Sequence, residues 1–250
     1  MDNPFLRTEM LIGKEGMDIL NNSTVCVFGI GGVGSYTVEA LVRSGIGNIV
    51  LVDYDIIDIT NINRQIHATH STIGRYKVEA MKERVLDINP YINIKTYNAK
   101  LEKTNIDSLL SKEYNYVVDA IDMISSKLDL IERCKIENIP IISCMGAGNK
   151  LDPTMLLVGD IYKTSVCPLA RVVRRELRKR KVDSLKVIWS KEKPIKVNLK
   201  NEETKKPVPG SVSFVPPVAG LIIASEVVKD LISKEGLLYG SSWISNKNKR

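Results

Sequence analysis

Short apolar runs alternate with longer amphipathic segments along the first part of the chain. Short apolar runs bounded by turn residues are typical of buried strands, whereas apolar residues three and four positions apart indicate helices. The pattern predicts strands over 24–28, 49–53, 92–97, 116–120 and 140–145. It predicts helices over 34–44, 75–89 and 125–138, and Pro90 stops the second of these.

Strands and helices that alternate at this spacing form a mostly parallel sheet with helices on both faces. The predicted fold class is therefore α/β and Rossmann-like, in one domain over residues 1–250. We expect a nucleotide-binding core over 1–160 and a substrate-side part over 161–250. In that second part the pattern predicts a basic helix over 168–181, a mobile loop near 191–210, a helix over 218–233 and a frayed tail over 246–250.

Composition restricts the class of protein. With 44% hydrophobic and 26% charged residues, the chain resembles an average soluble globular protein. Its net charge of +7 suits an anionic partner such as RNA or a nucleotide, although 6% aromatic residues argue against a base-stacking platform. We expect a cytoplasmic protein, because no stretch is typical of a signal peptide or an integral membrane segment.

Glycines and an acid follow the first two predicted strands. The run Gly29-Ile30-Gly31-Gly32-Val33-Gly34 lies between a strand and a helix, where glycines and free N–H groups can approach a phosphate. Asp53 ends the next strand, 24 residues after Gly29, where a carboxylate can accept hydrogen bonds from ribose hydroxyls. This pair alone leaves a nicotinamide or flavin enzyme and a nucleotide-triphosphate enzyme equally open.

The next polar segment favours a triphosphate. Arg64 lies in the segment 58–65, beyond the second strand, and Lys77 begins the following helix. Both cations would offset the charge that develops on the β- and γ-phosphates as pyrophosphate leaves. Asp119 and Asp122 lie at the end of another strand, where one of the two carboxylates could hold Mg²⁺.

The motifs GIGGVGS, TNINRQ and DAID, with the Asp53–Asp55 turn and Lys77, closely resemble the ubiquitin-activating-type adenylating enzymes over about 7–149. The resemblance implies that ATP activates a carboxylate as an acyl-adenylate. Relatives that adenylate sulfur-carrier proteins usually bind zinc through two CxxC pairs. The four cysteines of this chain form no such pair, so we expect no zinc.

Further motifs resemble one branch of this superfamily, the tRNA threonylcarbamoyladenosine dehydratases. They are RSGIG, NRQIHA, DINP, GAGNKLDPT and VPPVAGLI. The resemblance implies adenylation of the threonyl carboxylate beside the tRNA anticodon, followed by ring closure with release of AMP. It implies a homodimer in which Arg7 completes the partner's ATP site. It places ATP and Mg²⁺ on Gly29, Gly31, Gly32, Asp53, Asp55, Asn61, Arg64, Gln65, Lys77 and Asp122, with Mg²⁺ at Asp122.

Three other functions stay open. The first alternative is an adenylyltransferase of a sulfur-carrier protein, which would need a small carrier protein as substrate. The second is an RNA-binding or scaffold protein with a degenerate nucleotide site, against which the complete set of polar site residues argues. The third is a nicotinamide oxidoreductase, which a cofactor-binding assay by absorbance would separate.

Remaining candidates lie outside the nucleotide motifs. The helix over 168–181 carries cations that suit a phosphate backbone, and the candidate tRNA contacts are Arg171, Arg174, Arg175, Arg178 and Lys181. Cys167 is the one thiol expected to be exposed, whereas Cys26, Cys134 and Cys144 fit a core. His67 is expected to have a structural polar role rather than a substrate contact.

Overall fold

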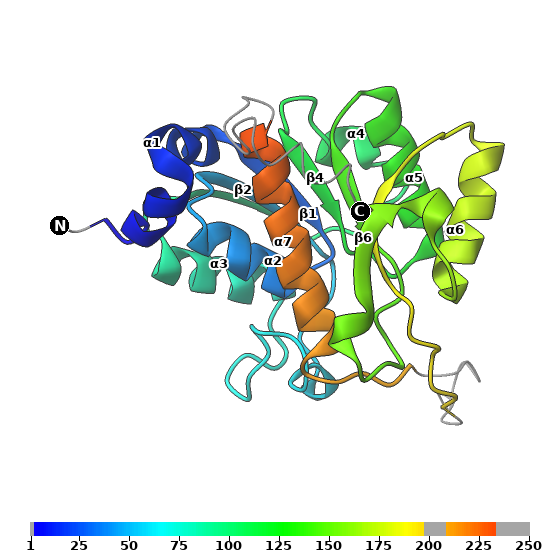
Figure 1. Cartoon of the computed structure of the whole chain (residues 1–250). Helices are drawn as coiled ribbons and strands as arrows, with labels where there is room; N and C mark the ends of the chain where they lie inside the picture. Colours follow the sequence, from blue (N-terminus) through cyan, green and yellow to red (C-terminus); the bar gives the residue numbers. More distant parts are fainter. Residues whose placement is uncertain (1–2, 198–208, 234–250) are drawn as a thin grey trace.

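Figure 1 shows the computed structural model of the chain, which describes residues 3–197 and 209–233. One seven-stranded sheet runs in the order β3-β2-β1-β4-β5-β7-β6. Its strands are β1 (Thr24–Phe28), β2 (Asn48–Val52), β3 (Asn93–Tyr97), β4 (Tyr116–Asp119), β5 (Ile141–Cys144), β6 (Leu156–Asp160) and β7 (Lys186–Ser190). Neighbouring strands are parallel except β6 and β7, so the predicted α/β fold is confirmed.

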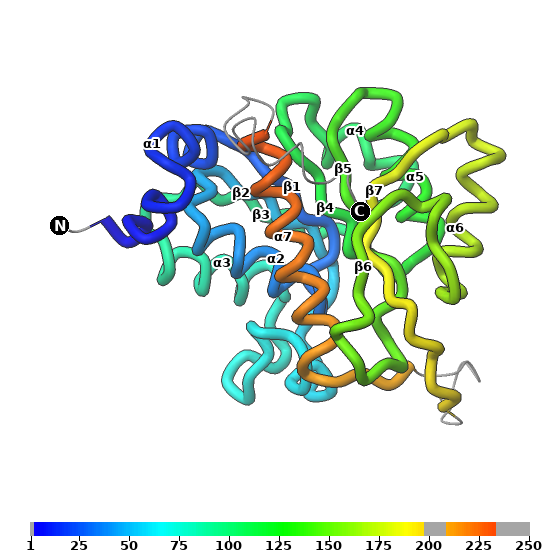
Figure 2. The backbone as a smooth tube through the Cα atoms, in the orientation of Figure 1, coloured from blue at the N-terminus to red at the C-terminus, as the bar shows by residue number. Residues whose placement is uncertain are grey.

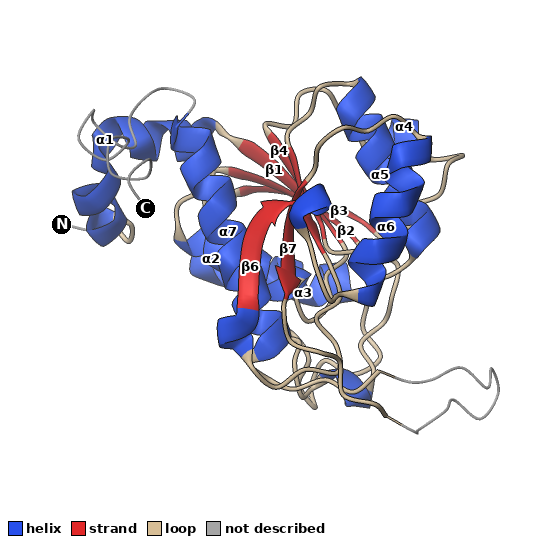
Figure 3. Cartoon of the chain, turned by 45° about the vertical axis from the view of Figure 1, so that its right-hand side comes forward, coloured by secondary structure: helices blue, strands red, loops and turns tan. Residues whose placement is uncertain are grey.

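Helices cover both faces of this sheet (Figures 2 and 3). They are α1 (Leu6–Asn22), α2 (Gly34–Arg43), α3 (Lys77–Ile88), α4 (Ile106–Leu109), α5 (Ile124–Ile136), α6 (Pro168–Lys179) and α7 (Val215–Ser233). Apolar residues of α1, α2, α3 and α7 join the core of one face, and those of α4, α5 and α6 join the core of the other. Short 3₁₀ turns occupy Ile59–Asn61, Pro153–Met155 and Ile161–Lys163.

Several elements differ from the prediction. The hydrophobic pattern does not predict α1, β6 or β7, and α7 begins at Val215 rather than at residue 218. Pro216 and Pro217 fit the first turn of α7, because N–H groups there have no partner within the helix. Most of the loop predicted near 191–210, and the tail predicted over 246–250, lie outside the described residues.

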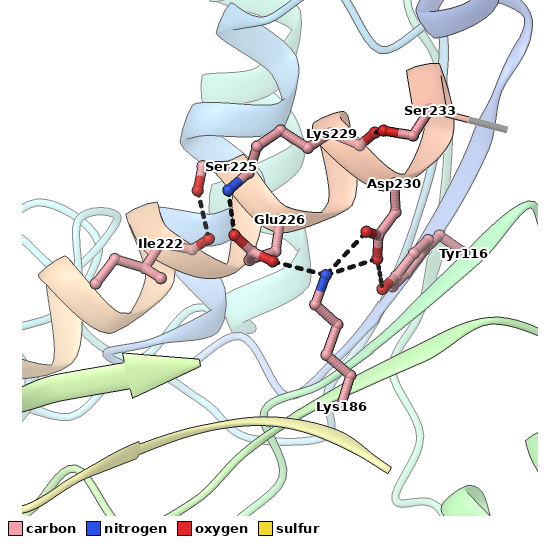
Figure 4. A network of polar contacts seen from close by, with 8 residues as sticks. All are labelled: Tyr116, Lys186, Ile222, Ser225, Glu226, Lys229, Asp230 and Ser233. Carbon is pink, nitrogen blue, oxygen red and sulfur yellow. Dashed lines mark hydrogen bonds and ion pairs between the residues drawn. The ribbon is translucent and has the colours of Figure 1, made fainter. Parts of the chain in front are cut away.

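Polar contacts fasten α7 to the amino-terminal edge of the sheet (Figure 4). The Lys186 ammonium, on β7, lies 2.6 Å from a Glu226 carboxylate oxygen and 2.8 Å from one of Asp230. The Tyr116 hydroxyl, on β4, donates to Asp230 at 2.6 Å. Lys186 holds the pKa of the Glu226 carboxyl below its usual value despite partial burial. This network fixes the carboxyl-terminal part of α7. The first turn of the same helix reaches the other edge of the sheet, where the strands have their carboxyl ends.

Candidate active site

A cavity of about 550 Å³ opens at the carboxyl ends of β1, β2 and β4. The strand order reverses between β1 and β4, and open α/β sheets bind ligands at such a switch point. The structure brings the predicted ATP and Mg²⁺ ligands together here, whereas Arg7 and the candidate tRNA contacts on 168–181 do not line this cavity. Those lining it are Gly29, Gly31, Gly32, Asp53, Asp55, Asn61, Arg64, Gln65, Lys77 and Asp122.

The glycine turn needs its glycines for close packing. Gly29 has a φ of +88°, and a Cβ atom at this position would lie 2.6 Å from the carbonyl oxygen of Ala120. A Cβ atom at Gly34 would lie 1.8 Å from the carbonyl oxygen of Gly29. A side chain at Gly29 would push the turn away from the end of β4, and one at Gly34 would push the start of α2 away from the turn, so the backbone that faces the cavity depends on both.

Asp53 holds this turn as well as facing the cavity. Its carboxylate accepts the N–H of Ile30 at 2.5 Å and the N–H of Asp55 at 2.8 Å. Burial raises the pKa of Asp53, while the Lys77 ammonium and these two N–H donors act in the opposite direction. The carboxylate thus couples β2 to the glycine turn, in addition to the ribose contact predicted from sequence.

Lys77 and Asp55 form an ion pair inside the cavity wall. Lys77 is the first residue of α3 and is 6% exposed. Its ammonium lies 2.6 Å from an Asp55 carboxylate oxygen. The pair neutralises a buried cation, which is costly to leave unpaired. It also holds the lysine in the cavity, where an incoming phosphate can share the positive charge.

The segment between β2 and α3 presents a cation and two amides. Asp58 begins the 3₁₀ turn with a capping box, accepting the Thr60 N–H while the Asn61 side chain accepts the Asp58 N–H. The Arg64 guanidinium is half-buried and donates at 2.9 Å to the carbonyl oxygen of Thr60. The Gln65 side-chain oxygen is buried and has no hydrogen-bond partner among the described residues. A ligand with donor groups would satisfy it.

The structure separates the two carboxylates that the sequence left open as Mg²⁺ ligands. Asp119 is fully buried, and its carboxylate lies 2.7 Å from the ammonium of Lys127, which is also fully buried. The Ser143 hydroxyl donates to the same Asp119 oxygen at 2.5 Å, and Lys127 donates to the Cys144 carbonyl at 3.0 Å. Asp122 is exposed and lines the cavity. Asp119 is therefore a structural anchor, and only Asp122 is available to a ligand.

A second cavity of about 450 Å³ adjoins the first. The two share Gly31, Gly32, Arg64, Ala120, Ile121 and Asp122 as common walls. The second cavity extends between the loop after β5, the amino terminus of α6 and the amino terminus of α7. Its far wall carries Lys150, which is 3% exposed. The Arg64 guanidinium and the Asp122 carboxylate thus lie at the junction of the two cavities.

The thiols and histidines offer little reactivity. The prediction that Cys167 is exposed is wrong, because its side chain is 3% exposed. Cys167 precedes α6 and packs against Gly146, in the loop after β5. The three other cysteines are buried as predicted, and burial raises the pKa of both Cys134 and Cys144 to about 12. Burial, with Lys77 and Arg84 nearby, lowers the pKa of His67 to about 4, so this imidazole is neutral at pH 7.

The cationic side chains of the basic helix α6 differ in their exposure. It buries Ala170, Val173 and Leu177. Arg174 is half-buried and donates to Thr164 at 2.7 Å, and the Arg178 guanidinium lies 5.4 Å from the centre of the Tyr162 ring. The exposed candidates of this set are Arg171, Arg175, Arg178 and Lys181. Arg174 is therefore the half-buried one of the five, whereas Arg175, which pairs with Glu176 at 3.1 Å, and Arg178 make their contacts from exposed positions.

Sequence reasoning missed Lys127 and Lys150. Lys127 has a usable signal, because Leu130 and Ile131 follow it at three and four positions and place it on the buried face of α5. Lysine on an apolar face implies a buried partner. Lys150 lies in an irregular loop after β5, where no periodicity reports burial.

Comparison with known proteins agrees with this geometry. The ThiF family model matches residues 5–249. The chain is 46% identical over 243 residues to tRNA threonylcarbamoyladenosine dehydratase of Bacillus subtilis, covering 93% of this chain and 96% of the relative. The molybdopterin-synthase adenylyltransferase of Salmonella typhimurium is 33% identical and matches 52% of this chain and 51% of its own length.

Solved structures show the same relationship. The tRNA N6-threonylcarbamoyladenosine dehydratase of Escherichia coli in complex with ATP superimposes with a TM-score of 0.86 at 33% identity. The match covers 94% of this chain and 96% of that chain. A structure of the same enzyme in complex with AMP gives an equal TM-score. The chain belongs to the ThiF family, in the branch of the tRNA threonylcarbamoyladenosine dehydratases.

Proposed function

We propose that this chain is an ATP-dependent tRNA threonylcarbamoyladenosine dehydratase. The observation that carries the proposal is the junction of two cavities at Arg64 and Asp122, one of them lined by the glycine turn and Asp53. Two substrates could meet there, as an adenylation reaction requires. The names of the relatives supply the substrate class. Residues 1–250 would form one adenylating domain that acts in the cytoplasm, with an ATP-binding core over 1–160 and a substrate-side part over 161–250.

ATP would occupy the first cavity. The glycine turn and the first N–H groups of α2 would face the phosphates, and Asp53 would accept from the ribose hydroxyls. Arg64 and Lys77 would bind the β- and γ-phosphates. Asp122 fits a Mg²⁺ ion, because this metal is usually held by one or two carboxylates together with phosphates and waters. The described residues contain no cluster of three or more histidine, cysteine or acidic ligands.

The reaction would proceed in two steps. A carboxylate oxygen of the threonyl group attacks the α-phosphorus, the bond between the α- and β-phosphates breaks, and pyrophosphate leaves. The ureido group of the same side chain then attacks the acyl carbon, loses a proton and expels AMP. Arg64 and Lys77 would stabilise the charge on pyrophosphate, and Mg²⁺ would supply further charge at the phosphates. The second step is intramolecular, so a high effective molarity accelerates it.

No step needs a covalent enzyme nucleophile. The four cysteines are at most 7% exposed, and high pKa values keep Cys134 and Cys144 as thiols at pH 7. A thioester route of the kind used by ubiquitin-type relatives therefore has little support in this chain.

Within the described ranges, no helix is both long and apolar enough to cross a membrane.

The proposed activity is tested by incubating the purified protein with ATP, Mg²⁺ and threonylcarbamoylated tRNA. The digested nucleosides should include one that is lighter by a single water, and AMP should form in equal amount. Omission of ATP is the control. Adenylation of a sulfur-carrier protein, with no dependence on tRNA, would instead support the alternative function.

A homodimer would complete the site. Arg7 is exposed on α1 and lines neither cavity of its own chain. Met10 and Leu11 follow it and are 78% and 86% exposed, which is unusual for large apolar side chains on a helix. A second copy of the chain would cover them. We infer that each Arg7 extends into the ATP cavity of the partner.

Mixing two inactive variants tests this arrangement. Arg7→Ala protein and Arg64→Ala protein should each lose activity, whereas a mixture that has exchanged subunits should recover part of it. In a mixed dimer, one of the two sites contains both arginines. The measurement is AMP formation, with subunit exchange shown by differently tagged chains. Exchange without recovered activity would place Arg7 in its own chain's site or in a structural role.

The tRNA backbone would follow α6. The amino terminus of this helix lines the second cavity, and its exposed cations continue away from it. Replacing Arg171, Arg175 and Arg178 together by glutamine should weaken tRNA binding. Each phosphate contact contributes about 0.7 to 0.9 to the slope of log affinity against log salt, so the slope should flatten by about two to three.

Binding is measured by titration of tRNA at several salt concentrations. Lys112→Gln removes one charge from an exposed lysine that lies before β4 and pairs with Glu137, and it is the control. ATP binding should be unchanged in the triple variant. A salt slope equal to that of the wild type would mean that α6 is only a solvated basic face.

A further inference from the structure

Lys150 is buried without a carboxylate partner. Its side chain is 3% exposed, and its ammonium donates to the carbonyl oxygens of Gly146 at 2.8 Å and Gly148 at 3.4 Å. Among the described residues, no acidic side chain forms an ion pair with it. Two carbonyl groups compensate only part of the cost of burying a full positive charge. Among the described residues, the positive charge of Lys150 is therefore not neutralised by an acidic side chain.

This charge belongs to the wall of the second cavity. Lys150 shares that wall with Arg64 and Asp122, the two residues at the junction with the nucleotide cavity. The amino terminus of α6, from Cys167 to Leu169, forms another part, and no side chain caps it. The positive end of the helix dipole adds to the field of the lysine. An anionic group in this cavity would meet Lys150 and a helix amino terminus, beside the opposite charges of Arg64 and Asp122 at the junction.

We propose that the second cavity binds the threonylcarbamoyl side chain of the substrate nucleoside, and that Lys150 recognises its carboxylate. The assignment rests on the proposed function, which requires an anionic carboxylate beside the α-phosphate of ATP. A volume of about 450 Å³ lies in the range of small-molecule sites. Asp122 alone would repel the carboxylate, and Arg64 is needed for the phosphates. Lys150 supplies the charge that neither of these residues can give to the acyl substrate.

Two substitutions separate charge from packing. Lys150→Gln keeps a polar N–H donor but removes the charge, whereas Lys150→Met removes both. The probes are the nucleoside N6-threonylcarbamoyladenosine and its neutral methyl ester, titrated in the presence of a non-hydrolysable ATP analogue. Wild-type protein should prefer the acid by about 10- to 100-fold, the effect of a charge-assisted hydrogen bond. Both variants should bind acid and ester almost equally.

Steady-state kinetics give a second readout. KM for threonylcarbamoylated tRNA should rise by a similar factor in both variants, while the Kd of the ATP analogue should change less than twofold. Lys191→Gln removes an exposed lysine from the end of β7 and should behave as the wild type.

Three outcomes would overturn the assignment. If Lys150→Gln behaves as the wild type and only Lys150→Met is impaired, the lysine merely supports the loop after β5. If both variants still prefer the acid, another group recognises the carboxylate while the dehydratase function stands. If wild-type protein binds neither nucleoside and converts no modified tRNA, the proposed function itself fails, and this inference fails with it.

Discussion

Arg64→Ala and Asp122→Ala are expected to lower the rate of AMP formation by about 10²- to 10³-fold, the usual effect of removing one group that stabilises transition-state charge. Both residues lie at the junction of the two cavities. Arg64 is half-buried and donates its hydrogen bonds to residues of its own loop, while Asp122 is exposed. Their removal leaves no cavity in the core, so the free energy of unfolding should change by about 1 kcal/mol or less.

The measurements are ATP-dependent AMP formation with modified tRNA, and unfolding in urea. Arg75→Ala is the matched control, because Arg75 is near the same loop but pairs with Glu83 and lines neither cavity. Its activity should remain close to that of the wild type. A rate near the wild-type value in either site variant would remove that residue from the reaction.

Lys127→Met is expected to lower the free energy of unfolding by about 3–5 kcal/mol, because it leaves the Asp119 carboxylate buried and unpaired. Both residues of this ion pair are completely inaccessible to solvent. The pair also joins β4 to β5, since Lys127 donates to the Cys144 carbonyl and Asp119 accepts from Ser143. The double variant with Asp119→Asn should recover part of the loss, since no buried charge then remains unpaired.

Urea unfolding followed by circular dichroism measures both variants. Lys135→Met, on the same helix but less buried, is the control and should change stability by about 1 kcal/mol or less. If Lys127→Met is as stable as the wild type, or if Asp119→Asn brings no recovery, the ion pair does not have the role given to it here.

Much of the fold could be predicted because apolar periodicity reports burial directly. The strand over 24–28 and the helices that became α2, α3 and α5 agree with the structure within two residues. Elements with weak periodicity escaped prediction. β6 lies at the edge of the sheet and is only half-buried, so its pattern resembles that of a loop. Gly13, with a φ of +74°, interrupts the helical geometry of α1.

For the candidate site too, the sequence could predict some features and not others. Arg64, Lys77 and Asp122 could be placed at one sheet edge, because residues after parallel strands share that edge. The residue pattern alone could not choose between Asp119 and Asp122, and only the family resemblance favoured Asp122, since the choice depends on Lys127 of α5. Nor could it show that Cys167 is covered, because the loop that covers it comes from β5. Contacts between distant segments decided each of these points.

The shared wall of the two cavities has a consequence for inhibitor design. A molecule that joins adenosine to a threonylcarbamoyl group through an uncleavable linker would occupy both spaces at once. After one half had bound, the other would be held near its own cavity at a high effective concentration. Affinity could then exceed that of either half by about 10²- to 10⁴-fold, without any new contact. Selectivity would come from the threonylcarbamoyl half, because nucleotide-binding cavities such as the first one are common among enzymes that use ATP.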